Sequence, residues 1–301
     1  MHDRGADTAL PERVHTGLVP EGDTVWLAAQ RMNTALAGGT LRRGEFRIPQ
    51  LATVDLAGAT VREVVPRGKH LLIRLDDGRT LRTHFRMDGS WHIYRPGTPW
   101  KGGPVYEVRV VLASDDWVCV GYRLHDIDLV PTAEEGSIVG HLGPDVLGSD
   151  WNLEEALRRL RGQPEEQIGV ALVDQRNLAG IGNLYKVESL FLLGVHPWTR
   201  VADVPDLAGL VDRARALMRT NLHHPEQNTT GDRRRGRDHW VFGRQGKPCF
   251  RCGTPVLLGE QGPPLQERVT WWCPRCQAAR SPIDPQARTG EPGHPRPVTV
   301  R

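Results

Sequence analysis

The sequence predicts a multidomain α+β protein: a β-sandwich or barrel with a leading helix, then a helical domain, then a small domain holding four cysteines. Three observations predict this order. Short β-rich runs between turn signals fill residues 40–130, apolar residues at helical spacing follow, and two CxxC pairs come last. A chain of 301 residues is long enough for two or three such domains.

The leading helix is expected from Asp23 to Leu36, where apolar residues recur at helical spacing until Gly38 and Gly39 end the pattern. Residues 1–18 precede it and lack the apolar core of a secretory signal. We expect this extension to be disordered or not translated.

Two β-hairpins are expected next. Residues 70–75 and 80–85 flank an Asp-Asp-Gly turn, and residues 105–112 and 117–124 flank a Ser-Asp-Asp turn. Cys119 falls in the last of these strands, where a buried position is expected. Strands at this spacing favour a sandwich or a barrel.

The helical domain is predicted from renewed helical spacing of apolar residues. Four helices are expected, at residues 153–160, 165–173, 183–193 and about 205–222. The polar, arginine-rich stretch 228–240 predicts a loop. The residues after Gln277 are rich in Pro, Arg and Gly with little apolar content, so we expect this tail to be disordered.

The composition restricts the class of protein. The formal net charge is +3 and the isoelectric point about 8.7, so the position of the charges matters more than their sum. No run of eighteen apolar residues occurs, which predicts that no helix spans a membrane. Cysteines in CxxC pairs favour a metal site in a reducing cytoplasm, where we expect this protein.

The two CxxC pairs predict one structural zinc site. The expected ligands are Cys249, Cys252, Cys273 and Cys276, with twenty residues between the pairs, enough for a β-hairpin. Four thiolates leave no open coordination position for a substrate. A redox-active CxxC is the alternative, but no thioredoxin-like pattern accompanies it.

Basic residues gather beside this site. Seven Lys and Arg against two Asp lie between Asn228 and Cys252, Arg244 among them, and Arg268 lies near the expected hairpin tip. A charge run is often only a solvated surface. A basic run beside a zinc hairpin favours contact with nucleic-acid phosphates.

The stretch Val19-Pro20-Glu21-Gly22 carries the sharpest chemical hypothesis. A chain-terminal proline is a secondary amine, a nucleophile that forms an iminium with an aldehyde-like carbon. Inside a chain its nitrogen is an amide. Valine is also the reading of a GTG start codon, so we predict that translation starts at Val19 as Met and that Met removal exposes Pro20. The alternative is a proline that simply opens a helix.

A glycine-broken turn precedes the helix expected at 183–193. Gly180 and Gly182 permit close approach of the backbone. The N–H groups that open the next helix would favour a phosphate, and Asn183 would cap that helix or donate to the same anion. A plain turn between two helices is the alternative.

Together these motifs resemble the DNA glycosylase/AP lyase family that contains formamidopyrimidine-DNA glycosylase and endonuclease VIII. The matching motifs are, in family order over residues 20–277, Pro20-Glu21-Gly22, Arg67-Gly68-Lys69-His70, Leu142-Gly143-Pro144-Asp145, Asp174-Gln175, Gly180-Ile181-Gly182-Asn183, Val241-Phe242-Gly243-Arg244 and the segment from Cys249 to Gln277. One departure is Thr24, which stands where the family usually carries a second glutamate.

The resemblance implies a domain layout. It assigns a catalytic β-sandwich with a leading helix to residues 19–148, a helix–two-turns–helix DNA-binding domain to 149–240, a zinc finger to 241–277 and a tail to 278–301. Double-stranded DNA with a damaged base or an abasic site would lie in the cleft between the halves, bound by a monomer.

The resemblance also implies catalytic roles. Pro20 would attack C1′ of the deoxyribose as the base leaves, and Glu21 would protonate the ring oxygen or shuttle protons during ring opening. A carboxylate that stabilises a helix N-terminus is the alternative for Glu21. Lys69 would reach the phosphate of the damaged nucleotide.

Four further residues would contact DNA by resemblance. Asn183 and Arg268 would hold phosphates that flank the lesion, with Arg244 beside them. Met87 would fill the space that the flipped base leaves, and core packing is its alternative.

Details of the resemblance imply that oxidised pyrimidines are the substrates, removed before β,δ-elimination cleaves the strand. Residues 125–129, His-Asp-Ile-Asp-Leu, occupy a stretch where the purine-directed branch carries an arginine-bearing loop. Val241-Phe242 and residues 271–274 look like the endonuclease VIII type, and the start resembles the second endonuclease VIII of actinobacteria. The alternatives are an enzyme for oxidised purines, a non-catalytic DNA-binding protein with Pro20 capped, and a zinc-ribbon module of transcription or ribosome machinery.

Overall fold

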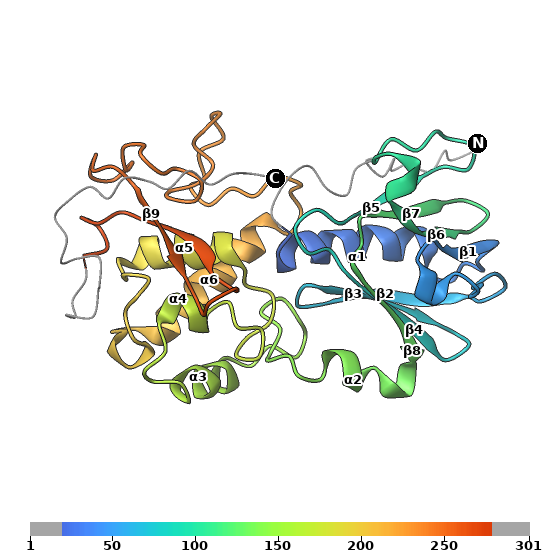
Figure 1. The fold of residues 1–301 in the computed structure, drawn as a ribbon, viewed down its shortest axis with the longest axis horizontal. Helices are drawn as coiled ribbons and strands as arrows, with labels where there is room; N and C mark the ends of the chain where they lie inside the picture. Colours follow the sequence, from blue (N-terminus) through green and yellow to red (C-terminus); the bar gives the residue numbers. More distant parts are fainter. Residues whose placement is uncertain (1–19, 279–301) are drawn as a thin grey trace, which may run out of the picture.

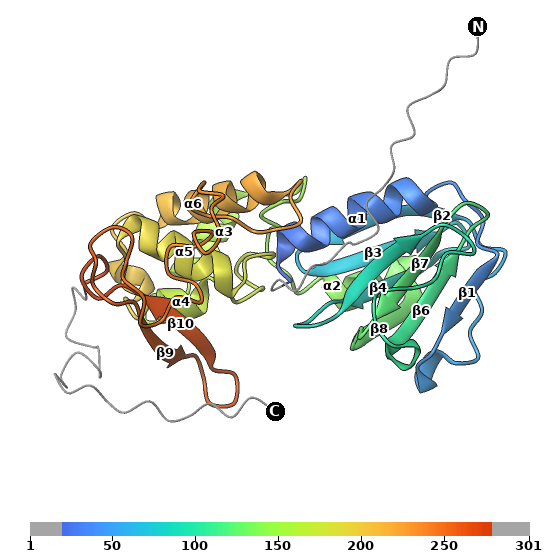
Figure 2. The same ribbon diagram turned by 90° about the horizontal axis from the view of Figure 1, so that it is seen from above.

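The computed structural model describes residues 20–278 and shows two halves side by side (Figures 1 and 2). One half is a β-sandwich, and the other holds most of the helices together with a C-terminal hairpin. Helix α1 lies along the sandwich with its N-terminal end directed at the helical half. The expectations for residues 1–18 and for residues 279–301 lie outside the described residues.

Helix α1 (Gly22–Leu36) agrees with the prediction to within one residue. Its first turn is closed by Thr24, whose hydroxyl accepts from the backbone N–H of Glu21 at 2.9 Å and donates to its carbonyl at 2.8 Å. Most of its apolar residues, among them Val25, Met32 and Leu36, are buried in the sandwich core. The helix ends before Gly38, which has a left-handed φ of +78°.

Two four-stranded antiparallel sheets make up the sandwich. The first has the order β1 (Arg43–Phe46), β6 (Val108–Ala113), β7 (Val118–Tyr122), β5 (Ser90–Tyr94). The second has the order β2 (Val61–Arg67), β3 (His70–Leu75), β4 (Arg79–His84), β8 (Asp126–Pro131). The predicted sandwich is therefore confirmed, and the barrel alternative is wrong.

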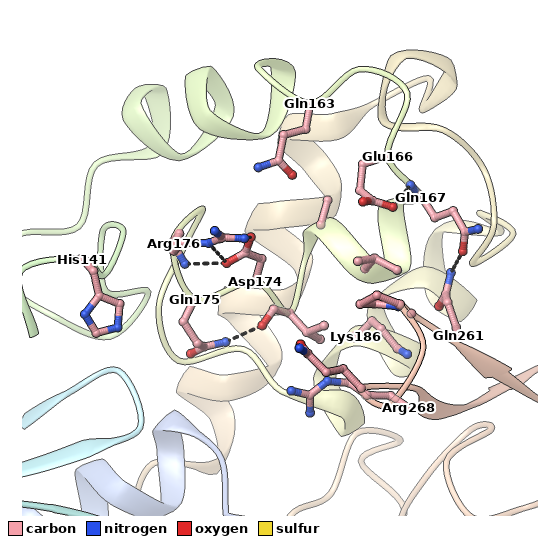
Figure 3. Close-up of a pocket in the computed structure, with 17 residues that line it drawn as sticks. His141, Gln163, Glu166, Gln167, Asp174, Gln175, Arg176, Lys186, Gln261 and Arg268 are labelled. Atoms are coloured by element: carbon pink, nitrogen blue, oxygen red, sulfur yellow. Dashed lines mark hydrogen bonds and ion pairs between the residues drawn. The ribbon is translucent and has the colours of Figure 1, made fainter.

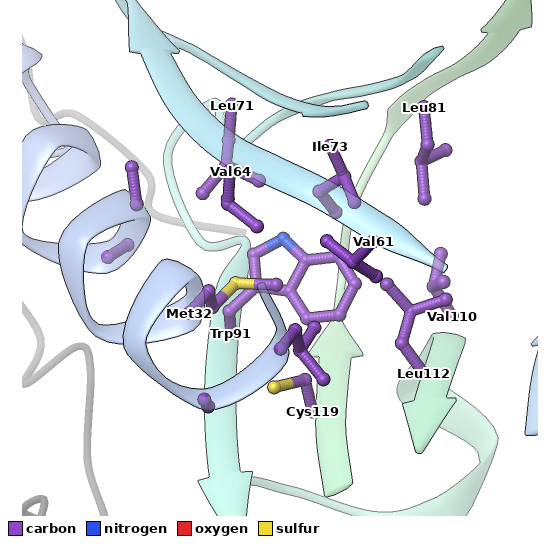
Figure 4. Close-up of a cluster of buried hydrophobic side chains, with 14 of the residues drawn as sticks. Met32, Val61, Val64, Leu71, Ile73, Leu81, Trp91, Val110, Leu112 and Cys119 are labelled. Atoms are coloured by element: carbon purple, nitrogen blue, oxygen red, sulfur yellow. The ribbon is translucent and has the colours of Figure 1, made fainter. Parts of the chain in front are cut away.

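The core of the sandwich lies between the sheets and under α1 (Figure 4). Trp91 is fully buried there, and its indole N–H donates to the hydroxyl of Thr83 at 3.2 Å. Met32 of α1 packs in the same cluster. Cys119 is buried in strand β7, as predicted.

Both predicted hairpins are confirmed, because β3 pairs with β4 and β6 pairs with β7, and the prediction of the sandwich is incomplete elsewhere. Strands β1, β2, β5 and β8 were not predicted. Residues Val105–Glu107, predicted as strand, form the 3-10 turn η2 after Pro104. Further 3-10 turns are η1 (Pro49–Leu51), η3 (Thr132–Glu134) and η4 (Val201–Asp203).

The helical half contains α3 (Leu153–Arg161), α4 (Ile168–Ala171), α5 (Asn183–Leu193) and α6 (Leu207–Asn221). The short helix α2 (Gly136–Val139) lies beside the sandwich, where Val139 packs with Leu72 of β3. The helix predicted over 165–173 is wrong beyond the single turn α4. The backbone N–H groups of Ile168 and Gly169 donate to the carbonyls of Thr199 and Pro197 at 2.8 and 3.0 Å, so they are not available to extend a helix.

The C-terminal part is packed against α5. After a long loop that includes the predicted loop 228–240, strands β9 (Leu257–Gln261) and β10 (Arg268–Trp272) form an antiparallel hairpin. The carboxylate of Glu188 on α5 is fully buried and accepts the N–H groups of Val241 and Phe242 at 2.8 and 2.9 Å. Within residues 20–278, no helix has the length and apolar character that a membrane crossing needs.

Candidate functional site

Four segments far apart in the sequence meet where the two halves join. The N–H of Gly22 donates to the carbonyl of Gly180 at 2.9 Å. The N–H of Gly68, which has a left-handed φ of +59°, donates to Asp145 Oδ2 at 2.6 Å, and Asp145 pairs with Ala179 as a parallel bridge. The structure thus brings the motifs around residues 20, 68, 145 and 180 into one place.

Glu21 is fully buried at this junction, and its carboxylate binds the N-terminus of α5. It accepts the N–H of Gly182 at 2.9 Å and the N–H of Leu184 at 2.7 Å. A Cβ atom on Gly182 would overlap the Glu21 carboxylate, so only glycine permits this approach. The helix N-terminus therefore binds a carboxylate of the chain itself, not the phosphate that the sequence predicted.

Asn183 is the first residue of α5 and does not cap it, because Gly182 occupies the N-cap position. This corrects the capping role predicted for Asn183. Its side-chain amide instead donates to the carbonyl of Val269 in β10 at 2.7 Å. The residue thus connects α5 to the C-terminal hairpin, and its contact with DNA stays a prediction.

Burial raises the pKa of Glu21 to about 7. Lys69 lowers this pKa, Asp23 raises it, and the N–H groups of Leu184 and Gly182 lower it. A carboxyl group with a pKa near neutrality can both release and take up a proton at physiological pH.

Lys69 lies in the turn between β2 and β3 and is partly buried. Burial lowers the pKa of Lys69 to about 8, with Glu21 raising it and Arg268 lowering it. Arg268, the first residue of β10, is exposed beside the hairpin loop, as predicted. The structure therefore places Lys69 within electrostatic influence of both Glu21 and Arg268.

Pro20 is buried directly before α1, next to Glu21 in the chain. Asp23, three residues after Pro20, is also buried, although no role was predicted for it. The hydroxyl of Tyr185 donates to Asp23 Oδ2 at 2.5 Å, and Gln227 Nε2 donates to Oδ1 at 3.0 Å. Burial raises the pKa of Asp23 to about 6. In the sequence, the position of Asp23 three residues after Pro20 was the one feature that could have pointed to a role at the site.

Met87 is 71% exposed in the turn between β4 and β5, so the core-packing alternative is wrong. The turn is held on both sides of the methionine. Arg86 pairs with Asp126 through two bonds of 2.8 Å, and His125 Nε2 lies 2.9 Å from Asp88 Oδ1. The apolar side chain is thus presented to solvent on a fixed backbone.

Arg244 is only 6% exposed, which corrects its predicted role in DNA contact. Its Nη1 and Nη2 atoms donate to the carbonyls of Trp240 and Pro248 at 2.6 and 2.8 Å. The guanidinium lies 3.3 Å from the ring centroid of Phe250. Arg244 therefore stabilises the C-terminal domain from within, which net charge alone does not reveal.

The four predicted metal ligands form one cluster. The sulfur atoms of Cys249, Cys252, Cys273 and Cys276 all lie within 4.8 Å of one another. Cys249 Sγ is 3.9 Å from Cys276 Sγ, and Cys252 Sγ is 3.4 Å from Cys273 Sγ. Tetrahedral zinc with Zn–S bonds of about 2.3 Å separates its sulfurs by about 3.8 Å. The cluster therefore fits a metal ion with four thiolate ligands.

Two family models match the chain. Residues 19–125 match the formamidopyrimidine-DNA glycosylase N-terminal domain, and residues 142–230 match the formamidopyrimidine-DNA glycosylase H2TH domain. The first segment covers the sandwich except strand β8, and the second covers helices α3 to α6.

Curated relatives match over nearly their whole length. The chain is 53% identical to a probable endonuclease 8 2 of Streptomyces coelicolor over 274 residues, which cover 90% of this chain and 98% of the relative. It is 41% identical to the DNA-(apurinic or apyrimidinic site) lyase Nei2 of Mycolicibacterium smegmatis over 261 residues, 87% of this chain and 100% of the relative.

Solved structures share the fold. The Lactococcus lactis formamidopyrimidine-DNA glycosylase bound non-covalently to DNA with an AP site has a TM-score of 0.72 and 21% identity, covering 86% of this chain and 100% of that chain. The same enzyme with DNA containing N7-benzyl-Fapy-dG has a TM-score of 0.70. At this identity the likeness shows the fold alone.

Proposed function

The chain belongs to the family of DNA-repair glycosylase/AP lyases that contains formamidopyrimidine-DNA glycosylase and endonuclease VIII, and we propose that it removes oxidised pyrimidines in base-excision repair. In this proposal the imino nitrogen of Pro20 is the nucleophile and Glu21 the proton donor. A damaged base inside a duplex is out of reach, so the nucleotide is first flipped out at a cost of a few kcal/mol.

Base removal starts with attack of the Pro20 nitrogen on C1′ of the deoxyribose. The bond from C1′ to the base breaks, and the base leaves with the electron pair and takes up a proton. The attacking amine loses its own proton. Glu21 protonates the ring oxygen O4′, the C1′–O4′ bond opens, and an iminium between C1′ and the proline nitrogen remains.

Strand cleavage follows from the same iminium. The cation withdraws electrons from C2′, so a C2′ proton is lost and the 3′ phosphate leaves by β-elimination. A second, δ-elimination releases the 5′ phosphate. Water then hydrolyses the iminium and restores the free amine of Pro20.

The observation that carries this proposal is the setting of Glu21. Its carboxyl group is buried next to Pro20, accepts the N–H groups of Gly182 and Leu184 at the N-terminus of α5, and has a pKa raised to about 7. A carboxyl group with that pKa is in part protonated at neutral pH, which a proton donor requires. Lys69 provides the positive charge that a nearby phosphate needs.

The DNA path is proposed to run across the junction of the halves. Lys69, Asn183 and Arg268 would hold backbone phosphates around the lesion, and these contacts would bend the strand and favour base flipping. Met87 would enter the stack from the exposed turn between β4 and β5 and occupy the space of the flipped base.

We propose zinc as the metal of the cysteine cluster. Cys249, Cys252, Cys273 and Cys276 would hold it, and a four-thiolate zinc supplies folding energy to the hairpin domain and takes no part in the reaction. Its contribution to function is the position of Arg268 on β10. Repair of chromosomal DNA also fits a cytoplasmic, nucleoid-associated protein of a bacterium, since the cysteine pattern favours a reducing cytoplasm and the resemblance is to bacterial enzymes.

Borohydride trapping on duplex DNA tests the nucleophile. A chain that begins at Pro20 is expected to form a covalent protein–DNA adduct on an abasic duplex, because hydride reduces the iminium to a stable amine. The chain that keeps residues 1–19 is expected to form none. Trapping of the longer form as efficiently as the trimmed chain would show that another amine acts.

A panel of duplexes tests the substrate class. Excision of thymine glycol and dihydrouracil is expected to exceed excision of 8-oxoguanine, with cleavage of a plain abasic site as the reference for lyase activity. Faster excision of 8-oxoguanine would assign the chain to oxidised purines. Binding without cleavage of any substrate by the trimmed chain would leave a DNA-binding protein.

A further inference from the structure

Lys186 on α5 is a buried cation to which the reaction described above gives no task. Its side chain is 1% exposed. Its ammonium donates to the hydroxyl of Thr270 in β10 at 2.7 Å. Among residues 20–278, no carboxylate lies within ion-pair distance of the ammonium.

The ammonium belongs to a buried polar network beneath the hairpin. Thr270 is within hydrogen-bond distance of Gln261 Oε1 at 3.4 Å, and Gln261 Nε2 donates to Gln167 Oε1 at 2.9 Å. The absence of a side chain on Gly169 makes room for Gln261, because a Cβ atom there would overlap Gln261 Oε1. The one hydrogen-bond partner that the described residues give the Lys186 ammonium is a neutral hydroxyl, so this bond solvates the charge without balancing it.

A cavity of about 810 Å³ lies beside this network, between α4 and the hairpin (Figure 3). Lys186 and Arg268 both line it, and Figure 3 shows them close together at one end. Two carboxylates lie on its wall, and neither contacts Lys186 or Arg268. Asp174 pairs with Arg176 at 2.7 Å, and Glu166 accepts the backbone N–H of Gln167 at 2.8 Å.

Lys186 and Arg268 therefore place two positive charges at one cavity, and neither forms an ion pair with a carboxylate of residues 20–278. Burial lowers the pKa of Lys186 to about 7, Arg268 lowers it further, and Glu21 raises it. An isolated buried charge destabilises a fold, and an anion placed next to it restores the balance. The cavity also lies next to Arg268, which is proposed to hold DNA.

We propose that this cavity is a binding site for one backbone phosphate of the DNA, and that Lys186 supplies the buried positive charge that balances it. This inference rests on the DNA-binding function proposed above. The phosphate would neighbour the one held by Arg268. Lys186 would then contribute affinity for any sequence and any lesion, since a phosphate carries no base information.

The test uses the full, metal-loaded chain and a duplex with a tetrahydrofuran abasic analogue, which cannot be cleaved. Fluorescence anisotropy over a series of salt concentrations gives both the affinity and its salt slope. Lys186→Met is expected to bind about tenfold more weakly and to lower the slope of log K against log salt by about 1. Its melting temperature should equal or exceed that of the parent, because an unbalanced buried charge is gone.

Two further variants separate charge from packing. Lys186→Gln keeps a hydrogen-bond donor for Thr270 without the charge, and it should reproduce the loss of salt slope. Lys101→Met removes an exposed lysine of the β-sandwich and should leave affinity and slope unchanged.

Three results would overturn the inference or its premise. An unchanged salt slope in both Lys186 variants would show that no phosphate faces the ammonium. A lower melting temperature with weaker binding at an unchanged slope would make Lys186 a purely structural link between α5 and β10. Failure of the parent chain to bind the duplex at all would remove the proposed function itself.

Discussion

Replacing Glu21 by glutamine removes the proposed proton donor and leaves the shape of the site nearly unchanged. The carboxylate accepts N–H groups from Gly182 and Leu184. The glutamine amide keeps one oxygen that can accept one of these N–H groups. Its NH₂ group faces the other N–H group, which loses its acceptor, and this costs about 1–3 kcal/mol. Against this, the raised pKa of Glu21 means that burial of its charged form costs about 3 kcal/mol, which a neutral amide avoids.

These opposing effects predict a small change in stability and a large change in activity. At pH 8 we expect the free energy of unfolding of Glu21→Gln to lie within about 2 kcal/mol of the parent. Loss of a general acid typically lowers a rate by about 10²–10⁴-fold. Base removal should fall by that factor, and β-elimination at a preformed abasic site should stay within about tenfold of the parent.

Single-turnover kinetics on a thymine glycol duplex and on an abasic duplex measure the two steps separately. Chemical denaturation and binding to the tetrahydrofuran duplex serve as controls for fold and affinity. The folded-state pKa of Glu21 lies above its ordinary value, so the acid form persists up to about pH 7. Base removal by the parent should decline as pH rises through about 7, and Glu21→Gln should lack this decline. Equal loss of both activities in a folded, DNA-binding variant would refute the role given to Glu21.

Three further perturbations have defined outcomes. The pKa of Asp23 is raised from 3.8 to about 6, so the stability that this group contributes is present below about pH 4 and is lost as pH rises through about 6. Chemical denaturation at several pH values measures this loss. Between pH 4 and 7 the free energy of unfolding of the parent should fall by about 3 kcal/mol more than that of Asp23→Asn. Gly182→Ala places a methyl group against the Glu21 carboxylate and should lower base removal at least tenfold, whereas Gly136→Ala, which meets open space, should not. Removing the metal with a chelator should abolish hydrogen-exchange protection in β9 and β10 and weaken DNA binding, while the amides of the sandwich stay protected. Adding zinc should restore both the protection of the hairpin and DNA binding. Full protection of the hairpin without metal would contradict a structural role.

Local patterns in the sequence predicted the elements that depend on local chemistry. Helices α1 and α5 follow the spacing of their apolar residues, and β3 and β4 flank a turn with a clear signature. The segment 165–173 has similar spacing, but its backbone donors bind carbonyls more than twenty-five residues away. Helical spacing alone does not reveal that competition.

Long-range contacts account for what the sequence reading missed at the site. The hydrogen bond from the Gly182 N–H to Glu21 joins residues 161 positions apart, and no periodic pattern in the sequence predicts it. Arg244 looked like a DNA contact because it lies in a basic run, but its contacts with Trp240 and Phe250 bury it. Recognition of a family supplied residue identities, whereas the protonation behaviour of Glu21 depends on burial that only the folded chain shows.

The carboxylate of Glu21 is the proposed proton donor, and it also connects the start of α1 to the N-terminus of α5. The rate of base removal should therefore depend on how the two halves of the protein are aligned. Helix α5 also holds the hairpin through Asn183 and Lys186. A mutation at the far side of that helix can therefore slow catalysis by shifting Glu21 a fraction of an ångström, well before the protein shows any tendency to unfold. Directed evolution of this scaffold should accordingly find rate-altering changes at the α5–hairpin contact, remote from the sugar.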